Sequence, residues 1–358
     1  MINVTKSFMP PLEEYEKYLK EIWNNAWLTN DGPLLKELAG KLEEYLNLEK
    51  LSLVSNGTMA LQLAINALEI QEGEIITTPF TFVATTNSII WEGCTPRFVD
   101  INKKDFCIDV NKIEKAITKN TKAILAVHVF GYPCDVDKIE EIARKYAIKV
   151  IYDGAHALGV RYKNKSLLSY GDVATCSFHA TKLFHTIEGG VCIAKEQEVC
   201  KKINAIYKFG DVNGTYKYNG TNAKMTEFQA AMGLVNIKYI DDIIEERKKI
   251  SELYDELLKG IIDRPKPKEG LEYNYSYYPV VFESEKILLE TIKRLNQNDI
   301  FPRRYFYPSL NTLSFLKNVQ KCEVSEDVSK RILCLPLYMG LEKEDVVKIC
   351  SIIKECKI

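Results

Sequence analysis

The stretch SFHATKLFHTIEGG, residues 177–190, gathers reactive side chains around one lysine, Lys182. Hydroxyl groups, two histidines and a carboxylate lie within six residues of it, and the stretch ends in Gly-Gly. Most lysines are solvated, but a lysine held against an apolar pocket loses its proton more easily and becomes a nucleophile. Because the hydroxyl of Ser177 is a suitable donor to a phosphate, its presence favours a built site over an ordinary loop.

A second candidate, Asp153, ends the apolar run KVIYD. A buried carboxylate is costly unless a cation or a hydrogen-bond donor faces it. The protonated ring nitrogen of a cofactor is one such partner, and a helix cap or a core network is the alternative. His156, three residues further on, is by the same standard more often a structural histidine than a reacting one.

The third candidate is the junction SNGTMAL, where Gly57 and Thr58 follow the apolar run LSLV. A helix that starts here directs its free backbone N–H groups and its dipole toward the strand ends, where a phosphate binds naturally. The alternative is a plain turn with Thr58 as a cap. A reactive lysine, an aspartate and a phosphate-binding helix start are the three parts that a pyridoxal phosphate site requires.

The elements around these residues predict an α/β fold with a mostly parallel sheet. Short apolar runs alternate with helical stretches from about residue 51 to Ile193, as in strands joined by crossover helices. Ligands of open α/β sheets bind beyond the carboxyl ends of the strands. Asp153, Ser177 and the turn at 55–58 all meet that condition.

Two domains are expected. Helical spacing over residues 12–28 and a proline-led restart at 33–46 predict two opening helices. After a long amphipathic helix or helix pair at 225–258, the composition shifts through DRPKPKEG into NYSYYPVVF and a helix at 284–297. We therefore expect residues 1–235 to form the N-terminal helices and a large domain, and residues 236–358 a smaller C-terminal α/β domain.

The composition is that of an ordinary globular protein. Its 48 basic and 49 acidic residues leave a net charge of -1, without the basic excess of nucleic-acid-binding proteins. The ten cysteines show no CxxC pair and no spacing that suggests a zinc site, so we expect reduced core thiols and no metal. No stretch approaches the roughly 20 apolar residues of a membrane span, and the N-terminus does not resemble a signal peptide. We expect a cytoplasmic protein without a nucleic-acid or membrane partner.

Six motifs, in order, resemble the DegT/DnrJ/EryC1/StrS family of pyridoxal-phosphate-dependent nucleotide-sugar aminotransferases. They are SNGTMAL, TPFTFVATTNSIIWEGCTPRFVDI, HVFGYPCDVDKI, IYDGAHALG, SFHATKLFHTIEGG and GTNAKMTEFQAAMG. The resemblance covers nearly the whole chain. It implies the aspartate aminotransferase type I fold, pyridoxal 5'-phosphate as cofactor, and an obligate homodimer with shared active sites.

The resemblance also implies a role for individual residues. Lys182 looks like the catalytic Schiff-base lysine, and Asp153 looks like the partner of the pyridine nitrogen. The other implied cofactor contacts are Gly57, Thr58 and Ser177 at the phosphate, Phe82 stacked on the ring, His156 beside the ring oxygen, and Asn222, which resembles the residue that reaches the phosphate of the neighbouring subunit's cofactor.

Substrate contacts are implied in two places. The SFHATK form, with His179, and His185 after the lysine resemble the subgroup that acts on dTDP-linked 4-keto-6-deoxyhexoses, although a structural hydrogen bond is the alternative for His185. The segment RRYFYPSL matches one that lies near the sugar diphosphate. There, one of two arginines is expected to pair with the diphosphate and one of two tyrosines to pack on the sugar. The candidates are Arg303 or Arg304, and Tyr305 or Tyr307.

The implied reaction is a ping-pong transamination with Lys182 as the base. Glutamate gives its amino group first, and dTDP-4-keto-6-deoxyglucose then takes it, yielding a 4-amino-4,6-dideoxy sugar for surface glycans. Related sugar dehydratases carry histidine in place of the lysine, so Lys182 favours transamination. The alternatives are a 3-aminotransferase on a dTDP-3-keto-6-deoxyhexose, a non-catalytic pyridoxal-phosphate-binding regulator, and an unrelated α/β protein.

Overall fold

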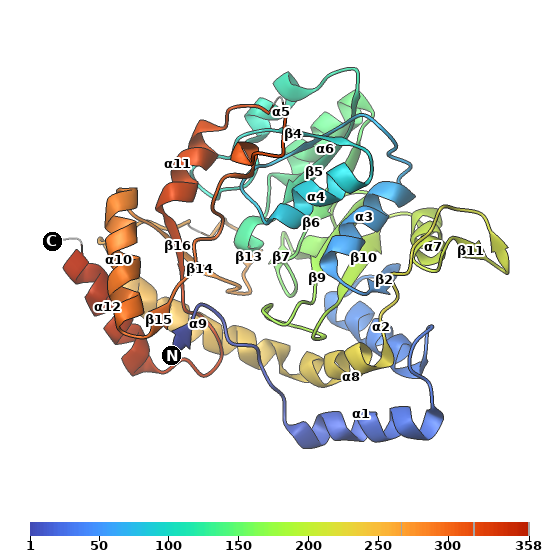
Figure 1. Cartoon of the computed structure of the whole chain (residues 1–358), viewed down its shortest axis with the longest axis horizontal. Coiled ribbons are helices and arrows are strands. Elements are labelled where there is room, and N and C mark those ends of the chain that lie inside the picture. Colours follow the sequence, from blue (N-terminus) through green and yellow to red (C-terminus); the bar gives the residue numbers. More distant parts are fainter. Residues whose placement is uncertain (266, 318, 357–358) are drawn as a thin grey trace.

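The central sheet carries the site. In the computed structural model, which describes residues 1–265, 267–317 and 319–356, it has seven strands in the order β2-β10-β9-β6-β5-β3-β4. Only β10 runs antiparallel to its neighbours, so the expected mostly parallel α/β sheet is confirmed (Figure 1). Along this order the strands are Leu51–Val54, Gly190–Ala194, Val173–Ser177, Lys149–Asp153, Thr121–Val127, Glu74–Thr77 and Thr95–Phe98.

Strand register brings distant residues to one edge of this sheet. Gly190, the first residue of β10, pairs with Val54 at the end of β2 and with Ser177 at the end of β9. Asp153 ends β6 and pairs with Thr175 of β9. The carboxyl ends of β2, β6 and β9 therefore meet at the start of β10, as expected for a ligand site in this class of fold.

Apolar side chains alternate along the inner strands and bury both faces of the sheet. In β6, Ile151 packs into one core, whereas Val150 and Tyr152 pack into the core on the opposite face. Buried strands of this kind need helices on both sides. The helices joined to these strands are α3 (Gly57–Ala67), α4 (Val83–Trp91), α5 (Val110–Ala116), α6 (Val136–Tyr146) and α7 (Gln197–Ile206).

The two predicted opening helices are confirmed as α1 (Leu12–Asn25) and α2 (Pro33–Leu46). The buried carboxylate of Glu227 accepts hydrogen bonds from the amides of Leu34 and Leu35, at 2.9 and 3.0 Å, and so caps α2. Glu227 is the first residue of α8 (Glu227–Asn236), and a short 3₁₀ turn (Ile237–Tyr239) links α8 to α9 (Ile240–Leu257). Helices α1 and α8 pack together along one side of the molecule (Figure 1).

The C-terminal part is built on a two-stranded antiparallel sheet of β14 (Tyr278–Val281) and β16 (Ile332–Leu335). It shares an apolar core with α9, α10 (Glu285–Gln297) and α12 (Lys343–Cys356), which lie together at one end of the molecule (Figure 1). The first strand, β1 (Ile2–Asn3), pairs with β15 (Ile300–Phe301), so the N-terminus lies against this part. The predicted domain division between residues 235 and 236 falls in the last turn of α8, which continues across it, and the division stays a prediction.

Smaller elements complete the described chain. They are the sheet of β7 (Arg161–Tyr162), β8 (Lys165–Ser166) and β13 (Leu271–Glu272), the hairpin of β11 (Asp211–Val212) and β12 (Thr215–Tyr216), and 3₁₀ turns at Val129–Gly131, Leu167–Ser169 and Leu310–Thr312. All ten cysteines are free, and only Cys356 is not fully buried. Within the described ranges, none of the helices has the length and apolar character needed to cross a membrane.

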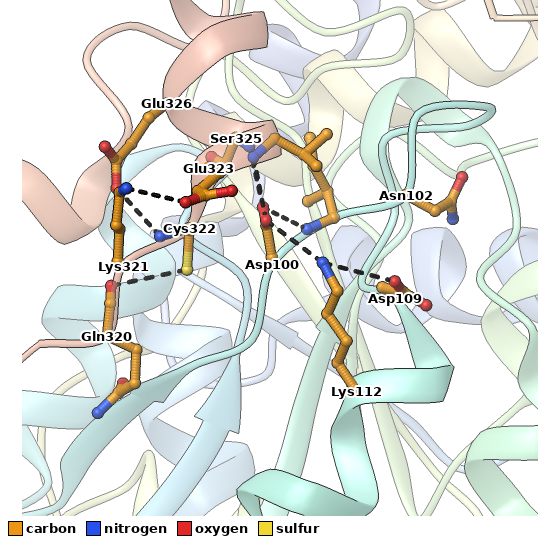
Figure 2. Close-up of polar contacts among 12 residues, drawn as sticks. Asp100, Asn102, Asp109, Lys112, Gln320, Lys321, Cys322, Glu323, Ser325 and Glu326 are labelled. Atoms are coloured by element: carbon orange, nitrogen blue, oxygen red, sulfur yellow. Dashed lines mark hydrogen bonds and ion pairs between the residues drawn. The ribbon is translucent and has the colours of Figure 1, made fainter.

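Asp100 ties the central sheet to helix α11 (Glu323–Arg331) of the C-terminal part (Figure 2). Its buried carboxylate accepts hydrogen bonds from the amides of Val324 and Ser325, at 3.0 and 2.9 Å, and lies 3.4 Å from Lys112 Nζ. These amides are the second and third of the helix, which have no partner within it. Asp100 therefore caps α11 from a segment more than two hundred residues away, and its negative charge suits the helix dipole.

Helix α11 in turn holds the segment 303–311. The hydroxyls of Ser309 and Ser325 lie 2.6 Å apart, and Asn311 Nδ2 donates to Glu326 Oε1 at 2.7 Å. Arg304 also donates to the carbonyl of Lys330, at 3.0 Å. Since α11 is capped by Asp100, that carboxylate helps to position this segment relative to the sheet, together with the hydrogen bond that the amide of Leu310 donates to the carbonyl of Pro79 at 2.9 Å.

We predict that Asp100→Ala lowers the free energy of unfolding by about 1–3 kcal/mol, because two buried amides lose their acceptor. Asp327→Ala, on the same helix, removes only a partly exposed ion pair with Arg331 and should change the free energy of unfolding by less than about 1 kcal/mol. Urea denaturation followed by circular dichroism measures both. Equal losses for the two variants would contradict the role of Asp100.

Candidate active site

A cavity of about 300 Å³ opens at the edge where β2, β6 and β9 end. Most of the residues singled out in the sequence line it, and they come from five separate segments. These residues are Gly57, Thr58, Phe82, Asp153, His156, Ser177, His179, Lys182, Arg303 and Tyr305. The site predicted from strand ends is therefore one continuous space.

Lys182 lies in the turn after β9, where its amide donates to the carbonyl of His179 at 2.8 Å. Its ammonium nitrogen stands 5.9 Å from the centre of the Tyr277 ring. Burial lowers the pKa of Lys182, and the neighbouring Tyr305 and Asp153 oppose this shift only in part. A neutral amine is therefore easier to reach here than on a surface lysine, which is what a nucleophile or base requires.

The start of α3 forms a close-fitting anion cradle. Asn56 caps the helix by accepting from the amide of Met59 at 2.9 Å, which leaves the first two amides, of Gly57 and Thr58, free of partners inside the helix. A Cβ on Gly57 would stand 2.8 Å from Ser177 Cβ, so only glycine allows this approach. Two free backbone N–H groups and a serine hydroxyl thus lie close together at one cavity, as in phosphate sites at helix starts.

The carboxylate of Asp153 is held at the cavity by two hydrogen bonds. It is 5% exposed, and it accepts from Thr85 Oγ1 at 2.8 Å and from the amide of Ala155 at 3.0 Å. Thr81, one helical turn before Thr85, extends this chain with a hydroxyl contact at 2.9 Å. Two donors leave lone pairs on a carboxylate that faces the cavity, so it still has room for a cationic partner.

His156 is a neutral donor at the cavity wall. Its Nδ1 accepts the amide hydrogen of Phe130 at 3.1 Å, so Nε2 is the nitrogen that carries the hydrogen. Its ring lies parallel to that of Phe306, with centres 6.0 Å apart. Burial, reinforced by the charge of Lys182, holds the pKa of His156 well below its ordinary value. A neutral N–H suits an oxygen atom of a bound ring.

Phe82 presents an aromatic face to the cavity. It precedes the first residue of α4, and 55% of its surface is exposed although it is a large apolar side chain. An exposed ring at a cavity mouth leaves apolar area for a ligand to cover. Its stacking on the cofactor stays a prediction.

The structure separates the two arginines and the two tyrosines. Arg303 lines the cavity, and its guanidinium lies 4.7 Å from the centre of the Tyr305 ring. Arg304 instead donates to Glu285 at 2.7 Å and covers the ring of Tyr307 at 3.5 Å. Because Tyr307 is not part of the cavity wall, Arg303 and Tyr305 are the better candidates for substrate contact.

His185 does not reach the cavity, and its expected role is corrected. It is 2% exposed, its Nε2 donates to the carbonyl of Phe8 at 2.7 Å, and its Nδ1 accepts from the amide of Ile187 at 3.2 Å. Asn236 donates to its carbonyl at 2.9 Å. His185 therefore ties the N-terminal segment to the loop after Lys182, which is the structural alternative that the sequence left open.

Asn222 also lies outside this cavity. It is exposed, and its side-chain oxygen accepts from Lys224 at 2.6 Å. A residue meant for a neighbouring subunit's site has to be accessible in this way. Its contact with a partner subunit stays a prediction.

Several residues that line or support the site were not assigned to it from the sequence, although Glu188 was noted as shaping the return into the next strand. Tyr277 and Phe306 line the cavity from the C-terminal part, and Glu188 lines it beside His179. Thr85 supports Asp153 from α4. The one signal for it was the spacing of Thr81 and Thr85, two hydroxyl residues four positions apart, although Thr81 itself precedes the helix, which begins at Val83.

Pyridoxal phosphate fits the residues of this cavity. The cradle at Gly57 and Ser177, where a Cβ would collide, suits its phosphate, and the Asp153 carboxylate suits a protonated ring nitrogen. Lys182, with its lowered pKa, lines the same space. A phosphate cradle, a carboxylate for the ring nitrogen and an amine for the aldehyde carbon are thus present in one cavity of this chain.

Comparison with known proteins agrees with this geometry. Residues 12–354 match the model of the DegT/DnrJ/EryC1/StrS aminotransferase family. The dTDP-4-amino-4,6-dideoxy-D-glucose transaminase of Shigella dysenteriae is 42% identical over 364 residues, covering 99% of each chain, and its Escherichia coli counterpart is 40% identical, covering 98% of each. A crystal structure of DesI in the presence of its TDP-sugar product superposes with a TM-score of 0.94 at 27% identity, covering 99% of this chain and 93% of DesI.

We predict that Lys182 reacts with acetic anhydride at a lower pH than an ordinary lysine, because burial lowers its pKa and its amine is neutral sooner. Lys145 is the matched control, since its hydrogen bond to Glu114 raises its pKa. The cofactor-free protein is labelled at a series of pH values, and peptide mass spectrometry then gives the pH at which acetylation of each lysine is half complete. A midpoint for Lys182 at or above that of Lys145 would show that the amine is not activated.

Proposed function

The chain belongs to the DegT/DnrJ/EryC1/StrS aminotransferase family, and we propose that it transfers the amino group of glutamate to dTDP-4-keto-6-deoxyglucose. The product would be dTDP-4-amino-4,6-dideoxyglucose. The relatives from Shigella dysenteriae and Escherichia coli, which match nearly the whole chain, are named for this product. The observation that carries the proposal is the position of Lys182 in one cavity with the Gly57 cradle and Asp153.

Pyridoxal phosphate is the cofactor of this proposal. When bound, it supplies an electron sink for the carbon from which a proton is removed. The amides of Gly57 and Thr58, with the hydroxyl of Ser177, would bind its phosphate. Asp153 would keep a proton on the ring nitrogen, and Phe82 would cover one face of the ring.

Lys182 would serve both as the covalent anchor and as the base. A neutral amine takes a proton from carbon, and the lowered pKa of Lys182 makes that form accessible. In the first half-reaction it would accept the proton from the α-carbon of glutamate, and in the second it would deliver a proton to C4 of the sugar as the amino group is transferred there. His156, neutral and donating through Nε2, would hold a ring oxygen in place.

The nucleotide-linked part of the substrate would lie toward the C-terminal wall of the cavity. Arg303 is the cation there, and a guanidinium can bind two oxygens of a diphosphate at once. Tyr305 would pack on the sugar beside it. The segment that carries both residues is held by α11, so the substrate wall is rigidly tied to the sheet.

A homodimer with shared sites completes the proposal. The cradle around Gly57 leaves the outer side of the phosphate site open to a further donor, and Asn222 is exposed on this chain. We propose that Asn222 reaches the phosphate site of the second subunit. Each site would then need residues from two copies.

We predict that the purified protein with pyridoxal phosphate and glutamate converts dTDP-4-keto-6-deoxyglucose to the 4-amino sugar, with 2-oxoglutarate as the second product. Mass spectrometry of the sugar and an enzymatic assay of 2-oxoglutarate measure the two products. A 3-keto isomer and a GDP-linked 4-keto sugar serve as competing substrates. Faster turnover of either would shift the substrate assignment, and formation of 2-oxoglutarate without any keto sugar turned over would leave only the donor half of the proposal.

Lys182→Ala should lower this turnover by at least about 10³-fold, because both the nucleophile and the base are lost. Lys201→Ala, which removes an exposed lysine paired with Glu198, is the control and should retain full turnover. Cofactor absorbance after gel filtration reports whether each variant still binds pyridoxal phosphate. Sustained turnover by Lys182→Ala would refute the assigned base.

Mixing Lys182→Ala with Asn222→Ala under subunit exchange should restore part of the activity, since one site of each mixed dimer then keeps both residues. Differently tagged subunits allow the mixed dimer to be purified and assayed. No recovery in a proven mixed dimer would argue against a shared site.

A further inference from the structure

The turn between β9 and β10, residues 185–189, contains a strained residue at the edge of the cavity. Ile187 has a φ of 69°, in the left-handed region that β-branched side chains avoid. Its side chain is 45% exposed, so apolar burial does not hold it there. Strain of this kind persists only where surrounding contacts enforce it, and it is most common at functional sites.

Hydrogen bonds to the main chain enforce this conformation. The carbonyl of Glu188 accepts from Thr186 Oγ1 at 2.8 Å and from Gln229 Nε2 at 2.7 Å, and the amide of Ile187 donates to His185 Nδ1 at 3.2 Å. Gln229 is itself fixed in a capping box with Thr226 at the start of α8. The backbone of Glu188 is therefore held by groups from two separate elements.

The adjacent glycine tightens the turn further. A Cβ on Gly189 would stand 1.9 Å from Thr186 Oγ1 and 2.8 Å from Met225 Cε. Only glycine fits there, which shows that the backbone at residue 189 is packed closely against Thr186 and Met225. Its carbonyl also accepts from the amide of Phe178 at 2.8 Å.

This turn presents the Glu188 carboxylate to the cavity opposite His179. Glu188 Oε1 lies 3.5 Å from His179 Nε2, and the two side chains are 54% and 46% exposed. His179 Nδ1 accepts the amide hydrogen of Thr181 at 3.2 Å, so Nε2 carries the ring hydrogen. Within the described chain, Glu188 has no lysine or arginine at ion-pair distance, so its carboxylate remains an available acceptor.

We propose that Glu188 and His179 form the subsite for the hexose ring of the substrate, an inference that rests on the proposed function. The carboxylate accepts a hydrogen bond from a ring hydroxyl, and His179 Nε2 donates to a second hexose oxygen. Two polar groups with opposite roles, an acceptor and a donor, suit neighbouring hydroxyls of a sugar.

Charge assigns this subsite to the sugar rather than to the other parts of the substrates. A carboxylate repels the diphosphate and both carboxylates of glutamate, so these anionic groups belong with Arg303 and the Gly57 cradle. The hexose is the uncharged, hydroxyl-rich part, so it is the part of the substrates that can lie beside the carboxylate without repulsion. Glu188 thus distinguishes sugar from anion within one cavity.

The test is the binding of dTDP and of dTDP-4-amino-4,6-dideoxyglucose to the enzyme in its pyridoxamine phosphate form, which cannot react with an amino sugar, measured by isothermal titration calorimetry. Glu188→Gln should weaken binding of the amino sugar by about tenfold, since a charged hydrogen bond to the hexose is lost. Binding of dTDP, which has no hexose, should stay within about twofold. The substitution keeps the shape of the side chain and leaves the main-chain carbonyl that holds the turn.

Glu198→Gln, on the surface of α7, is the matched control and should bind both ligands like the wild type. Equal binding of the amino sugar by Glu188→Gln and the wild type would overturn the subsite, as would an equal loss for dTDP and the amino sugar. A wild type that gains no affinity from the hexose would overturn it too. If the wild type binds neither ligand, the proposed function fails and the subsite falls with it.

Discussion

The close contact of three backbone segments at one edge of the sheet positions the rest of the site. Gly190 pairs with Val54 and Ser177, and a Cβ on Gly190 would stand 2.7 Å from the carbonyl carbon of Asn56. Strand ends from three distant parts of the sequence are thereby held together more tightly than any side chain would permit. The helix start at Gly57, the turn with Lys182 and the turn with Glu188 all leave from this contact, so their relative positions are set by strand pairing rather than by flexible loops.

Burial is the second constraint, and it determines which groups at the site are charged. Water is excluded around Lys182 and His156, so the pKa of each is lowered and the neutral form is favoured. For His156 this has a cost in stability: the folded protein binds its proton less readily than the unfolded chain, so stability falls as the pH drops below about 6.5, the ordinary histidine value. Asp153 is instead fixed in position by hydrogen bonds from Thr85 and Ala155. Burial and local hydrogen bonding thus give the lysine and the aspartate different surroundings within one cavity.

The sequence was sufficient for the parts of the site that follow from local pattern. Lys182, Asp153 and Gly57 each come directly after an apolar run, and the carboxyl ends of such strands converge whatever the tertiary details. His185 was misjudged because its environment comes from Phe8 and Asn236, which no local pattern connects to it. Tyr277 and Phe306 were missed for the same reason, since they reach the cavity only through the packing of the C-terminal part against the sheet. The choice of Arg303 over Arg304 likewise depends on which of them Glu285 engages.

The floor and the opposite wall of the cavity come from different parts of the chain. The proposed reacting residues therefore lie on one part and the proposed substrate-binding residues on the other. The floor, with Lys182 and Asp153, belongs to the sheet edge and cannot change without disturbing strand pairing. The opposite wall, with Arg303 and Tyr305, belongs to a segment that is held by α11 and, through Asp100, by the sheet. Under the proposed function, substitutions in that segment or at Glu188 would alter which substrate binds while Lys182 and Asp153 stay in place. The capping carboxylate of Asp100 contributes to the link between the two parts, together with the hydrogen bond from the amide of Leu310 to the carbonyl of Pro79, because both contacts hold the proposed substrate wall against the sheet that leads to Lys182.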